Sequence, residues 1–428
     1  MSYIKAFKSI SLLWLSSILG SGSTFILYAI LARRLGPQDF GLLSNALAII
    51  SVILLICGFG ISKTWLKLFG KEGWVGLRWI RPSLKLLGLN LIVFSILIIC
   101  IDYTSLIDEV SSNLFRIMLF HIYGYCVIEL IISKLQLEEK YIEMAIWQLI
   151  PNLLRLITVI IIVYVFNLSI NVQKVGFIYG IIGAILTFFG FKQLIDINEN
   201  NFSLKGHIKP LKISYSIPKI KELFNESWPF GMAGLFAFIY LQSDIIMVKY
   251  ISGDMATGHY NVAFIVLSAV FVVPVVIFSK FLMPKYHRWS NQDMSKLHKA
   301  YIRGNLSMLI IGFILMIIIF CFAPYFTPII FGIEYEPAVQ LLQILSITIP
   351  IYFVAYSVGA MLITSEQMKL KVKLMGGIAV INVIANLILI PLYGNIGAAS
   401  ATILSNAILL LLYWIFVNKN VFNQINLK

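Results

Sequence analysis

The stretch from Asp196 to Ser227 reads DINENNFSLKGHIKPLKISYSIPKIKELFNES and is the one long polar interruption of the chain. It contains five lysines and two helix breakers, namely Lys205, Lys209, Lys212, Lys219, Lys221, Pro210 and Pro218. Apolar runs separated by short polar joints lie on both sides of it. The pattern predicts a basic linker (196–227) between an N-terminal lobe (1–195) and a C-terminal lobe (228–428).

The composition places these lobes in a membrane. The 428 residues are 60% hydrophobic and only 12% charged, whereas soluble domains are about 45–50% apolar and about 25% charged. The first apolar run, from Ile10 to Leu31, is longer than the core of a signal peptide, which has about 7 to 15 residues. We therefore expect an uncleaved first membrane span.

Apolar runs of about 20 residues, the length needed to cross a bilayer as a helix, recur along the whole chain. Six precede the linker, at 10–31, 41–62, 84–101, 114–133, 144–166 and 175–195, and six follow it, at 228–250, 260–283, 304–322, 339–362, 373–391 and 397–417. The sequence therefore predicts an all-α membrane protein with twelve transmembrane helices in two pseudo-symmetric six-helix lobes around a central cavity.

The distribution of Lys and Arg predicts the orientation. With both termini in the cytoplasm, 27 of the 33 basic residues lie on the cytoplasmic side. Five lie at the outer face (Arg33, Arg34, Arg116, Lys174 and Lys249), and Arg155 lies within a span. Since basic residues concentrate in cytoplasmic loops, the linker is expected to be cytoplasmic. The net charge of +14 is then a topogenic signal, and no nucleic-acid partner is needed to explain it.

An internal repeat relates the two halves. Gly36, Gly41 and Ala46 follow the first span, and three residues follow the seventh span with the same spacing, shifted by 217 positions: Gly253, Gly258 and Ala263. Both joints fall at the predicted outer face, as expected for parallel repeats related by an axis along the membrane normal. A chance recurrence of frequent glycines is the alternative explanation.

Three stretches resemble a known family. They are ARRLGPQDFGLLSNALA (32–48), IIFGIEYEPAVQLLQIL (329–345) and NVIANLILIPLYGNIGAASATILS (382–405), which are similar to the polysaccharide exporters that include the Wzx-type O-antigen flippases. The resemblance implies a flippase that moves an undecaprenyl-diphosphate-linked oligosaccharide between leaflets of the bacterial inner membrane by alternating access. It also implies a polysaccharide polymerase and ligase as partners. Multidrug antiporters and the peptidoglycan-precursor flippase belong to the same superfamily.

The sequence contains no motif of an enzyme. No phosphate-cradling Gly-x4-Gly-Lys-Ser/Thr loop is present, and the His, Cys, Asp and Glu residues show no metal-ligand spacing. We therefore predict a protein that is not an enzyme and that needs no cofactor and no metal.

Arg155 is the candidate for substrate binding inside the membrane. A charged residue near the bilayer centre costs at least about 2.5–3.5 kcal/mol and usually faces a cavity or a partner. A guanidinium can bind a diphosphate through two parallel hydrogen bonds. The alternative is a structural ion pair with a buried carboxylate such as Glu129.

Asp244 and Glu129 are the candidates for ion coupling. Asp244 lies in YLQSDIIMVKY (240–250), a run that resembles the seventh helix of the family, and could take up a proton or a cation. The alternative is a carboxylate that only joins helices. For Glu129, an ion pair with Lys134 at the interface is the alternative. His121 could titrate near neutral pH, although a lone histidine in an apolar helix is more often a packing residue.

Two basic stripes lie between the second and third spans. Lys63, Lys67 and Lys71 are spaced i, i+4, i+8, and the other stripe is spaced i, i+3, i+7: Arg78, Arg81 and Lys85. If the segment is helical, each stripe forms one face. We predict that Arg78, Arg81 and Lys85 help to gather an anionic diphosphate headgroup. Docking to anionic membrane lipid is the alternative.

Two other functions compete with the flippase. A cation-coupled multidrug antiporter would require several carboxylates within the membrane, and here Asp244 and Glu129 oppose Arg155 and Lys85. A membrane scaffold for polysaccharide enzymes would tolerate changes inside the cavity. The balance of charges favours an anionic cargo.

Overall fold

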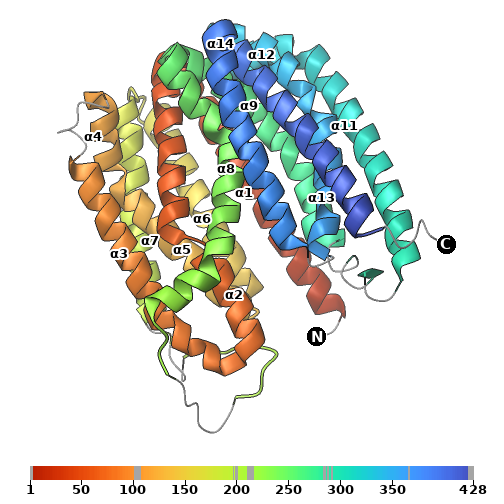
Figure 1. Cartoon of the computed structure of the whole chain (residues 1–428). Helices are drawn as coiled ribbons and strands as arrows, with labels where there is room; N and C mark the ends of the chain where they lie inside the picture. Colours follow the sequence, from red (N-terminus) through yellow and green to blue (C-terminus); the bar gives the residue numbers. More distant parts are fainter. Residues whose placement is uncertain are drawn as a thin grey trace. The chain divides into compact units, whose positions relative to one another are not determined.

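The computed structural model describes residues 3–100, 108–195, 197, 201–209, 216–282, 286, 289–290, 293–364 and 367–422. These residues are almost entirely helical, and no strand occurs among them (Figure 1). The all-α prediction is confirmed. Parts of the predicted linker (196, 198–200 and 210–215, with Lys212 and Pro210) and the last predicted residue of two spans (101 and 283) lie outside the described residues.

The chain divides into two compact units. Unit 1 consists of Met1–Leu27 and Ile49–Leu235, and unit 2 consists of Tyr28–Ala48 and Phe236–Lys428. Two long helices, α1 (Tyr3–Gly58) and α8 (Ile220–Ser252), contribute to both units. The units thus differ from the predicted lobes in the placement of residues 28–48 and 228–235, and the lobes remain a prediction based on the repeat.

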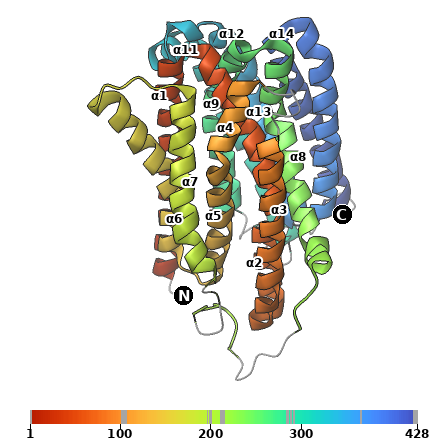
Figure 2. The same ribbon diagram turned by 90° about the vertical axis from the view of Figure 1, so that its left-hand side faces the viewer.

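Unit 1 is built around the pair α5 and α7 (Figure 2). Besides parts of α1 and α8, it contains α2 (Ile61–Glu72), the 3₁₀ segment η1 (Gly73–Trp79), α3 (Ile80–Cys100), α4 (Glu109–Ile117), α5 (Leu119–Leu137), α6 (Tyr141–Ile160), the π-helical segment η3 (Ile161–Val165) and α7 (Val172–Ile195). Glycines let α5 and α7 approach each other, because a Cβ on Gly183 would lie 2.4 Å from the carbonyl oxygen of Phe120. This close approach brings His121 next to Tyr179.

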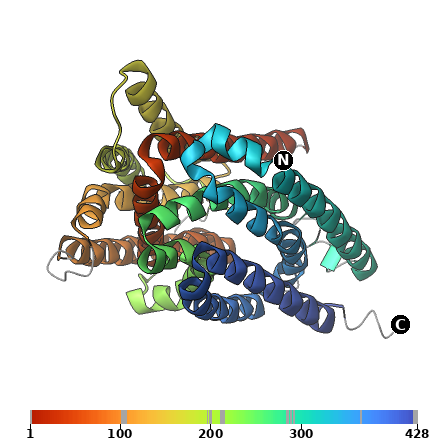
Figure 3. The same cartoon turned by 90° about the horizontal axis from the view of Figure 1, so that it is seen from above.

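Unit 2 is centred on α13, which packs against α11 and α14, while α12 packs against α9. Figure 3 shows these helices from above, coloured green to blue in chain order. Besides parts of α1 and α8, its elements are α9 (Asp254–Val275), the π-helical segment η4 (Val276–Leu282), α11 (Met294–Phe331), the 3₁₀ turn η5 (Ile333–Tyr335), α12 (Pro337–Ser346), α13 (Thr348–Thr364) and α14 (Met368–Asn420). Buried polar side chains from α8, α9 and α14 gather inside this unit.

The predicted spans coincide with these helices. In the described residues, eight helices are long and apolar enough to cross a membrane, or nine if the bent pair α4 and α5 forms one span. Several predicted spans share one continuous helix: α1 breaks at Gly36 (φ 74°, ψ 171°) and α14 at Gly394 (φ 58°, ψ −136°), and each supplies two of them. The apolar stretch Leu15–Cys100 contains α3 as well as most of α1. Each of the twelve predicted spans therefore overlaps a helix.

The internal repeat is visible in the backbone. Gly253 (φ 91°, ψ 175°) has nearly the same conformation as Gly36 (φ 74°, ψ 171°), a region that favours glycine because other residues would be strained there. The two joints also meet within unit 2. A Cβ on Gly41 would lie 1.8 Å from the carbonyl oxygen of Asp254, and a Cβ on Gly258 would lie 2.0 Å from that of Pro37. The repeat is therefore structural and not a coincidence of composition.

Candidate functional site

A polar stripe on α5 forms the first part of the candidate site, in unit 1. His121, Tyr125 and Glu129 are four residues apart and therefore lie on one face of the helix. Arg155 of α6 reaches this stripe, with its Nη2 3.2 Å from Nδ1 of His121. Its guanidinium carbon lies 4.4 Å from the ring centroid of Tyr179 on α7, within the range of a cation–π interaction.

The contact between Arg155 and His121 fixes the role of the imidazole. A guanidinium can only donate hydrogen bonds, so Nδ1 of His121 accepts one and carries no proton. Arg155 has no carboxylate within ion-pair distance among the described residues, and its buried Nε has no hydrogen-bond partner there. The predicted alternative of an ion pair with Glu129 is therefore not formed. The guanidinium is oriented by neutral groups and retains capacity to bind an anion.

Glu129 has a different partner. Its Oε2 accepts a hydrogen bond from the hydroxyl of Ser62 on α2 at 3.0 Å, and its side chain is exposed in the structure. No ion pair between Glu129 and Lys134 is formed by these two described residues. The carboxylate thus sits at the contact between α2 and α5 and forms no ion pair with Arg155.

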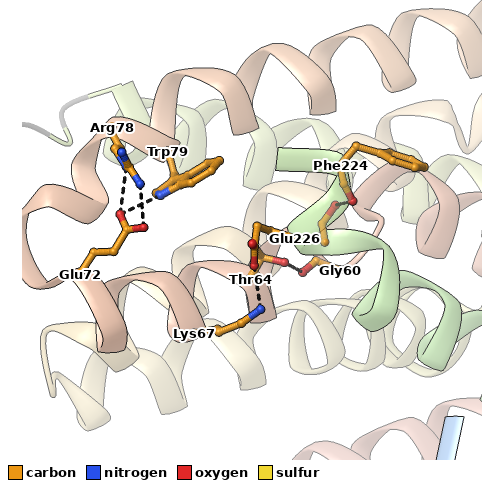
Figure 4. A network of polar contacts seen from close by, with 9 residues as sticks. Gly60, Thr64, Lys67, Glu72, Arg78, Trp79, Phe224 and Glu226 are labelled. Atoms are coloured by element: carbon orange, nitrogen blue, oxygen red, sulfur yellow. Dashed lines mark hydrogen bonds and ion pairs between the residues drawn. The ribbon is translucent and has the colours of Figure 1, made fainter. Parts of the chain in front are cut away.

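The first basic stripe is confirmed as a helical face. Lys63, Lys67 and Lys71 are all exposed on α2, while its opposite face is buried. Lys67 forms an ion pair of 2.7 Å with Glu226 at the start of α8 (Figure 4). An exposed pair of this kind contributes at most about 1 kcal/mol, so the stripe remains available to anionic headgroups.

The second basic stripe is interrupted. Arg78 lies in the 3₁₀ segment η1, because Gly73, with φ +59°, ends α2 and α3 begins only at Ile80. Its Nε and Nη2 donate to the carboxylate of Glu72 at 3.0 and 2.8 Å, and the indole of Trp79 donates to the same carboxylate at 3.0 Å (Figure 4). Arg78 therefore lies before α3 and is bound by Glu72, so the three basic residues do not belong to one α-helix.

Arg81 and Lys85 remain on one face of α3, and both are exposed. No ion pair involves either of them in the part of the chain that the structure describes. Of the three predicted headgroup contacts, Arg81 and Lys85 are thus free to bind an anion, whereas Arg78 is held by Glu72.

The described part of the linker, residues 201–209, packs against the junction between α2 and η1. Phe202 packs edge-on against Phe69 and Trp74, with ring centroids 5.3 and 6.0 Å apart. The indole of Trp74 donates to the carbonyl oxygen of His207 at 3.3 Å, and Lys209 lies 5.2 Å from the Trp74 ring centroid. Residues 201–209 are therefore part of the folded unit and not a free tether.

A buried carboxylate forms the second part of the candidate site, in unit 2. Asp244 of α8 accepts hydrogen bonds from Tyr260 (2.9 Å) and Thr402 (2.5 Å) at Oδ2 and from the Asn386 amide (2.6 Å) at Oδ1. All four side chains are buried. Tyr260 is on α9, while Asn386 and Thr402 are on the two halves of α14. Sequence reasoning identified Asp244 but none of these partners.

This cluster is rich in oxygen and lacks a cation. Among the described residues, no Lys or Arg lies within ion-pair distance of Asp244. The side-chain oxygen of Asn386 is buried without a hydrogen-bond partner, and that of Asn382 accepts from Ser243 at 3.1 Å. A buried carboxylate without a counter-charge is costly, and a proton or a monovalent cation would remove that cost. The described residues contain no group of three His, Cys, Asp or Glu side chains that could hold a metal ion.

The fold and the apolar helices that carry these two polar sites define a multi-pass, all-helical membrane protein. A family model described as polysaccharide biosynthesis protein matches residues 6–290. The chain belongs to this family, as the resemblance of its three quoted stretches predicted.

Two archaeal relatives match over most of the chain. An uncharacterized membrane protein of Methanocaldococcus jannaschii is 24% identical over 412 residues, which cover 92% of this chain and 93% of the relative. The probable low-salt glycan biosynthesis flippase Agl15 of Haloferax volcanii is 24% identical over 402 residues, which cover 92% of this chain and 80% of the relative.

Solved structures share the fold. The inward closed conformation of the lipid II flippase MurJ has a TM-score of 0.74 at 15% identity, covering 96% of this chain and 87% of that one. An inward-facing multidrug resistance MATE transporter of the MOP superfamily has a TM-score of 0.73 at 14% identity, covering 94% and 95%. The similarity confirms the all-α membrane fold.

Proposed function

We propose that this protein is a flippase for a polyprenyl-diphosphate-linked oligosaccharide. The observation that carries the proposal is Arg155, a guanidinium in a membrane-spanning helix that neutral groups orient and no carboxylate neutralises. A diphosphate is an anion that such a guanidinium binds through paired, charge-assisted hydrogen bonds. Membership of the polysaccharide biosynthesis family supports a glycan as the remainder of the cargo.

The basic face of α3 would act before Arg155. Arg81 and Lys85 are exposed and free of carboxylate partners in the described chain, so they can attract the diphosphate as it leaves the headgroup region. Arg78 would contribute only if a ligand displaced Glu72, which binds it with two hydrogen bonds. The sugars would follow the diphosphate, while the polyprenyl tail stays in lipid.

We assign the coupling role to Asp244, with Glu129 as a second candidate. Asp244 would bind a proton or a monovalent cation, because its oxygen-rich surroundings include no fixed positive charge. Occupancy of this site would bias an alternating-access cycle in which lobes 1–195 and 228–428 open a central cavity to each side in turn. The termini and the linker would face the cytoplasm, as the distribution of Lys and Arg indicates.

The finer features of the proposal follow from the family resemblance. They are an undecaprenyl carrier, an O-antigen or related repeat unit, the bacterial inner membrane, and a polymerase and a ligase that act on the product. The Haloferax volcanii relative is a probable low-salt glycan biosynthesis flippase, which supports a glycan cargo.

A cation-coupled multidrug antiporter is the second candidate. The exposed carboxylate of Glu129 favours it, since this carboxylate accepts a hydrogen bond from the neutral hydroxyl of Ser62 and could attract a cationic drug. The structural similarity to MATE transporters is compatible with either function, because both share the fold.

The deciding experiment uses a strain that lacks the protein. Its lipids are extracted, polyprenyl-diphosphate-linked oligosaccharide is measured, and surface glycan is quantified. We expect the linked unit to accumulate and surface glycan to be lost, with recovery from the wild-type gene but not from Arg155→Ala at equal protein abundance. Arg303→Ala, which removes an exposed arginine of α11, serves as the matched control and should restore export.

Unchanged lipid and glycan pools, together with greater sensitivity to cationic drugs, would discard the flippase and establish the antiporter. Changes in α5, α6 and α8 that leave export intact, while loop changes abolish it, would instead indicate a scaffold for polysaccharide enzymes.

A further inference from the structure

Lys371 differs from the other lysines at the start of α14. Lys369, Lys371 and Lys373 alternate along the first turns of this helix. Lys369 and Lys373 are exposed, whereas Lys371 is partly buried. A lysine near the end of a membrane-spanning helix normally extends its ammonium toward the aqueous interface. Lys371 instead directs its ammonium toward other elements of unit 2.

Two contacts define where the ammonium lies. Its Nζ donates a hydrogen bond to the carbonyl oxygen of Gly359 on α13 at 3.3 Å. It also lies 5.8 Å from the ring centroid of Tyr413, in the second half of α14. The ammonium is thus placed where α13 and both halves of α14 come together.

Gly359 makes this arrangement possible. A Cβ at this position would lie 2.7 Å from Cε2 of Tyr413 and 3.6 Å from Nζ of Lys371. Any side chain here would push the Tyr413 ring away and fill the space next to the ammonium. The absence of a side chain therefore keeps the ammonium close to a carbonyl and an aromatic face.

The charge of Lys371 is not neutralised. No carboxylate lies within ion-pair distance of its Nζ in the described part of the chain. An ammonium has three N–H donors, and the contact with Gly359 uses one of them. Withdrawing an unpaired charge from water is costly, and a carbonyl and a ring face offset only part of that cost. The position would be more stable with an anion in contact with the two remaining donors.

We propose that Lys371 binds a phosphate or diphosphate group in unit 2. The inference rests on the proposed function, for which it supplies an anion contact in the second unit in addition to Arg155 in the first. Ammonium groups bind phosphates as compact point charges. With the predicted orientation, Lys371 is at the cytoplasmic end of its helix, where a lipid-linked diphosphate would enter.

Tyr413 limits the side from which an anion can reach the ammonium of Lys371. The aromatic ring stabilises the ammonium through its π face without neutralising it, as a carboxylate would. The ring occupies one side of the charge and Gly359 another, so an anion approaches from the remaining side. Lys369 and Lys373 have no such support among the described residues, and they serve as surface charges.

Direct binding to the purified full-length protein tests the proposal. The protein is placed in nanodiscs of phosphatidylcholine, and the dissociation constants of farnesyl diphosphate and of inorganic pyrophosphate are measured by thermophoresis at two salt concentrations. The variants are Lys371→Met, Lys371→Arg and, as the matched exposed control, Lys373→Met. All variants are first checked for a single symmetric peak in size-exclusion chromatography.

We expect Lys371→Met to weaken farnesyl diphosphate binding at least tenfold and to reduce its dependence on salt. Lys373→Met should stay within twofold of wild type, and Lys371→Arg should recover most of the affinity. If inorganic pyrophosphate binds as well as farnesyl diphosphate with the same dependence on Lys371, the anion site stands and its ligand is a free phosphate compound.

Equal affinities of wild type and Lys371→Met for both probes would overturn the proposal, and so would a wild-type protein that binds neither probe. Neither result decides the flippase function, which is tested separately by the surface glycan and lipid pools of the deletion strain. The two failures are therefore distinguishable.

Discussion

Asn261 donates a hydrogen bond to the hydroxyl of Ser44 at 2.5 Å, across a sequence separation of 217 residues. This separation equals the shift between the two glycine joints of the repeat, so the two residues occupy equivalent positions. The contacts of Gly41 with Asp254 and of Gly258 with Pro37 are related by the same shift. Equivalent residues of a repeat meet in this way only next to the axis that relates the two copies.

The close contact at Gly41 predicts a large effect of a single methyl group. Gly41→Ala would place a Cβ 1.8 Å from the carbonyl oxygen of Asp254, so the backbones would have to separate at a cost of about 1–3 kcal/mol or more. We expect a clear fall in the melting temperature of the detergent-solubilised protein. Gly377→Ala, at a glycine of α14 with open space around it, should leave the melting temperature unchanged. Equal melting temperatures for both variants would contradict the packing at this joint.

The contact between His121 and Arg155 predicts that a hydrogen-bond acceptor is needed at position 121. His121→Phe keeps an aromatic ring but removes the acceptor, and a hydrogen bond to a charged group contributes about 1.5–3 kcal/mol. We expect glycan export to fall roughly tenfold or more, while His121→Gln, which retains an acceptor, keeps most of it. Export is measured as labelled surface glycan per unit of membrane-inserted protein. Full export by His121→Phe would show that this contact does not orient Arg155.

The Asp244 cluster predicts that a substitution can remove the dependence of transport on an ion gradient without unfolding the protein. Asp244→Asn keeps the shape and one acceptor oxygen but removes the charge that a proton or cation would balance. We expect transport by this variant in proteoliposomes to lose its response to an imposed pH or sodium gradient. Thr402→Val removes one hydrogen bond and should only shift the ion concentration at half-maximal rate. A gradient response in Asp244→Asn equal to wild type would exclude this carboxylate from coupling.

Glu138 predicts a pH-dependent anchor for the linker. Its Oε1 accepts a hydrogen bond from the backbone of Ser203 at 3.3 Å, and its Oε2 forms an ion pair of 3.0 Å with Lys140. The hydrogen bond with Glu138 raises the pKa of Lys140 above its ordinary value of 10.5. A raised lysine pKa stabilises the folded state below pH 10.5, and this contribution is lost as the pH rises through the folded-state value.

Limited proteolysis measures this anchor. Glu138→Gln should increase cleavage within the linker at pH 8, because the ion pair is lost and the amide can replace only one acceptor. Wild-type protection should persist at neutral pH and decrease above pH 10.5, whereas the variant should show no such transition. Glu139→Gln is the matched control. Identical cleavage rates for wild type and Glu138→Gln would show that Glu138 does not hold residues 201–209.

The sequence was sufficient for the helices but not for the partners of the charged side chains. The length of apolar runs determines where helices form, and the spacing of Gly36 and Gly253 revealed a repeat whose joints share one backbone conformation. Two of the three partners of Asp244, however, are 142 and 158 residues away, at Asn386 and Thr402. No local pattern encodes such a contact, because it depends on how α8 and α14 pack.

The stripe of Arg78, Arg81 and Lys85 shows a different limit. The spacing was correct for a helix, but Gly73 with φ +59° ends α2 and a 3₁₀ segment follows. Glu72 then binds Arg78 from only six residues away. Gly73, which precedes an aromatic-rich segment, is the feature of the sequence that indicates a helix end. The regular spacing of the basic residues favours a continuous helix instead.

Residues 28–48 belong to unit 2, so they can pack only after the later part of that unit has been synthesised. Gly41 leaves the ribosome about 200 residues before its contact partner Asp254, and at about 5–20 residues per second this interval lasts roughly 10–40 s. Throughout this interval, the joint at residues 36–41 lacks the segment of α9 that packs against it. The N-terminal portion of a nascent chain therefore cannot complete this packing alone, and a chain that stalls before Asp254 leaves the joint uncovered.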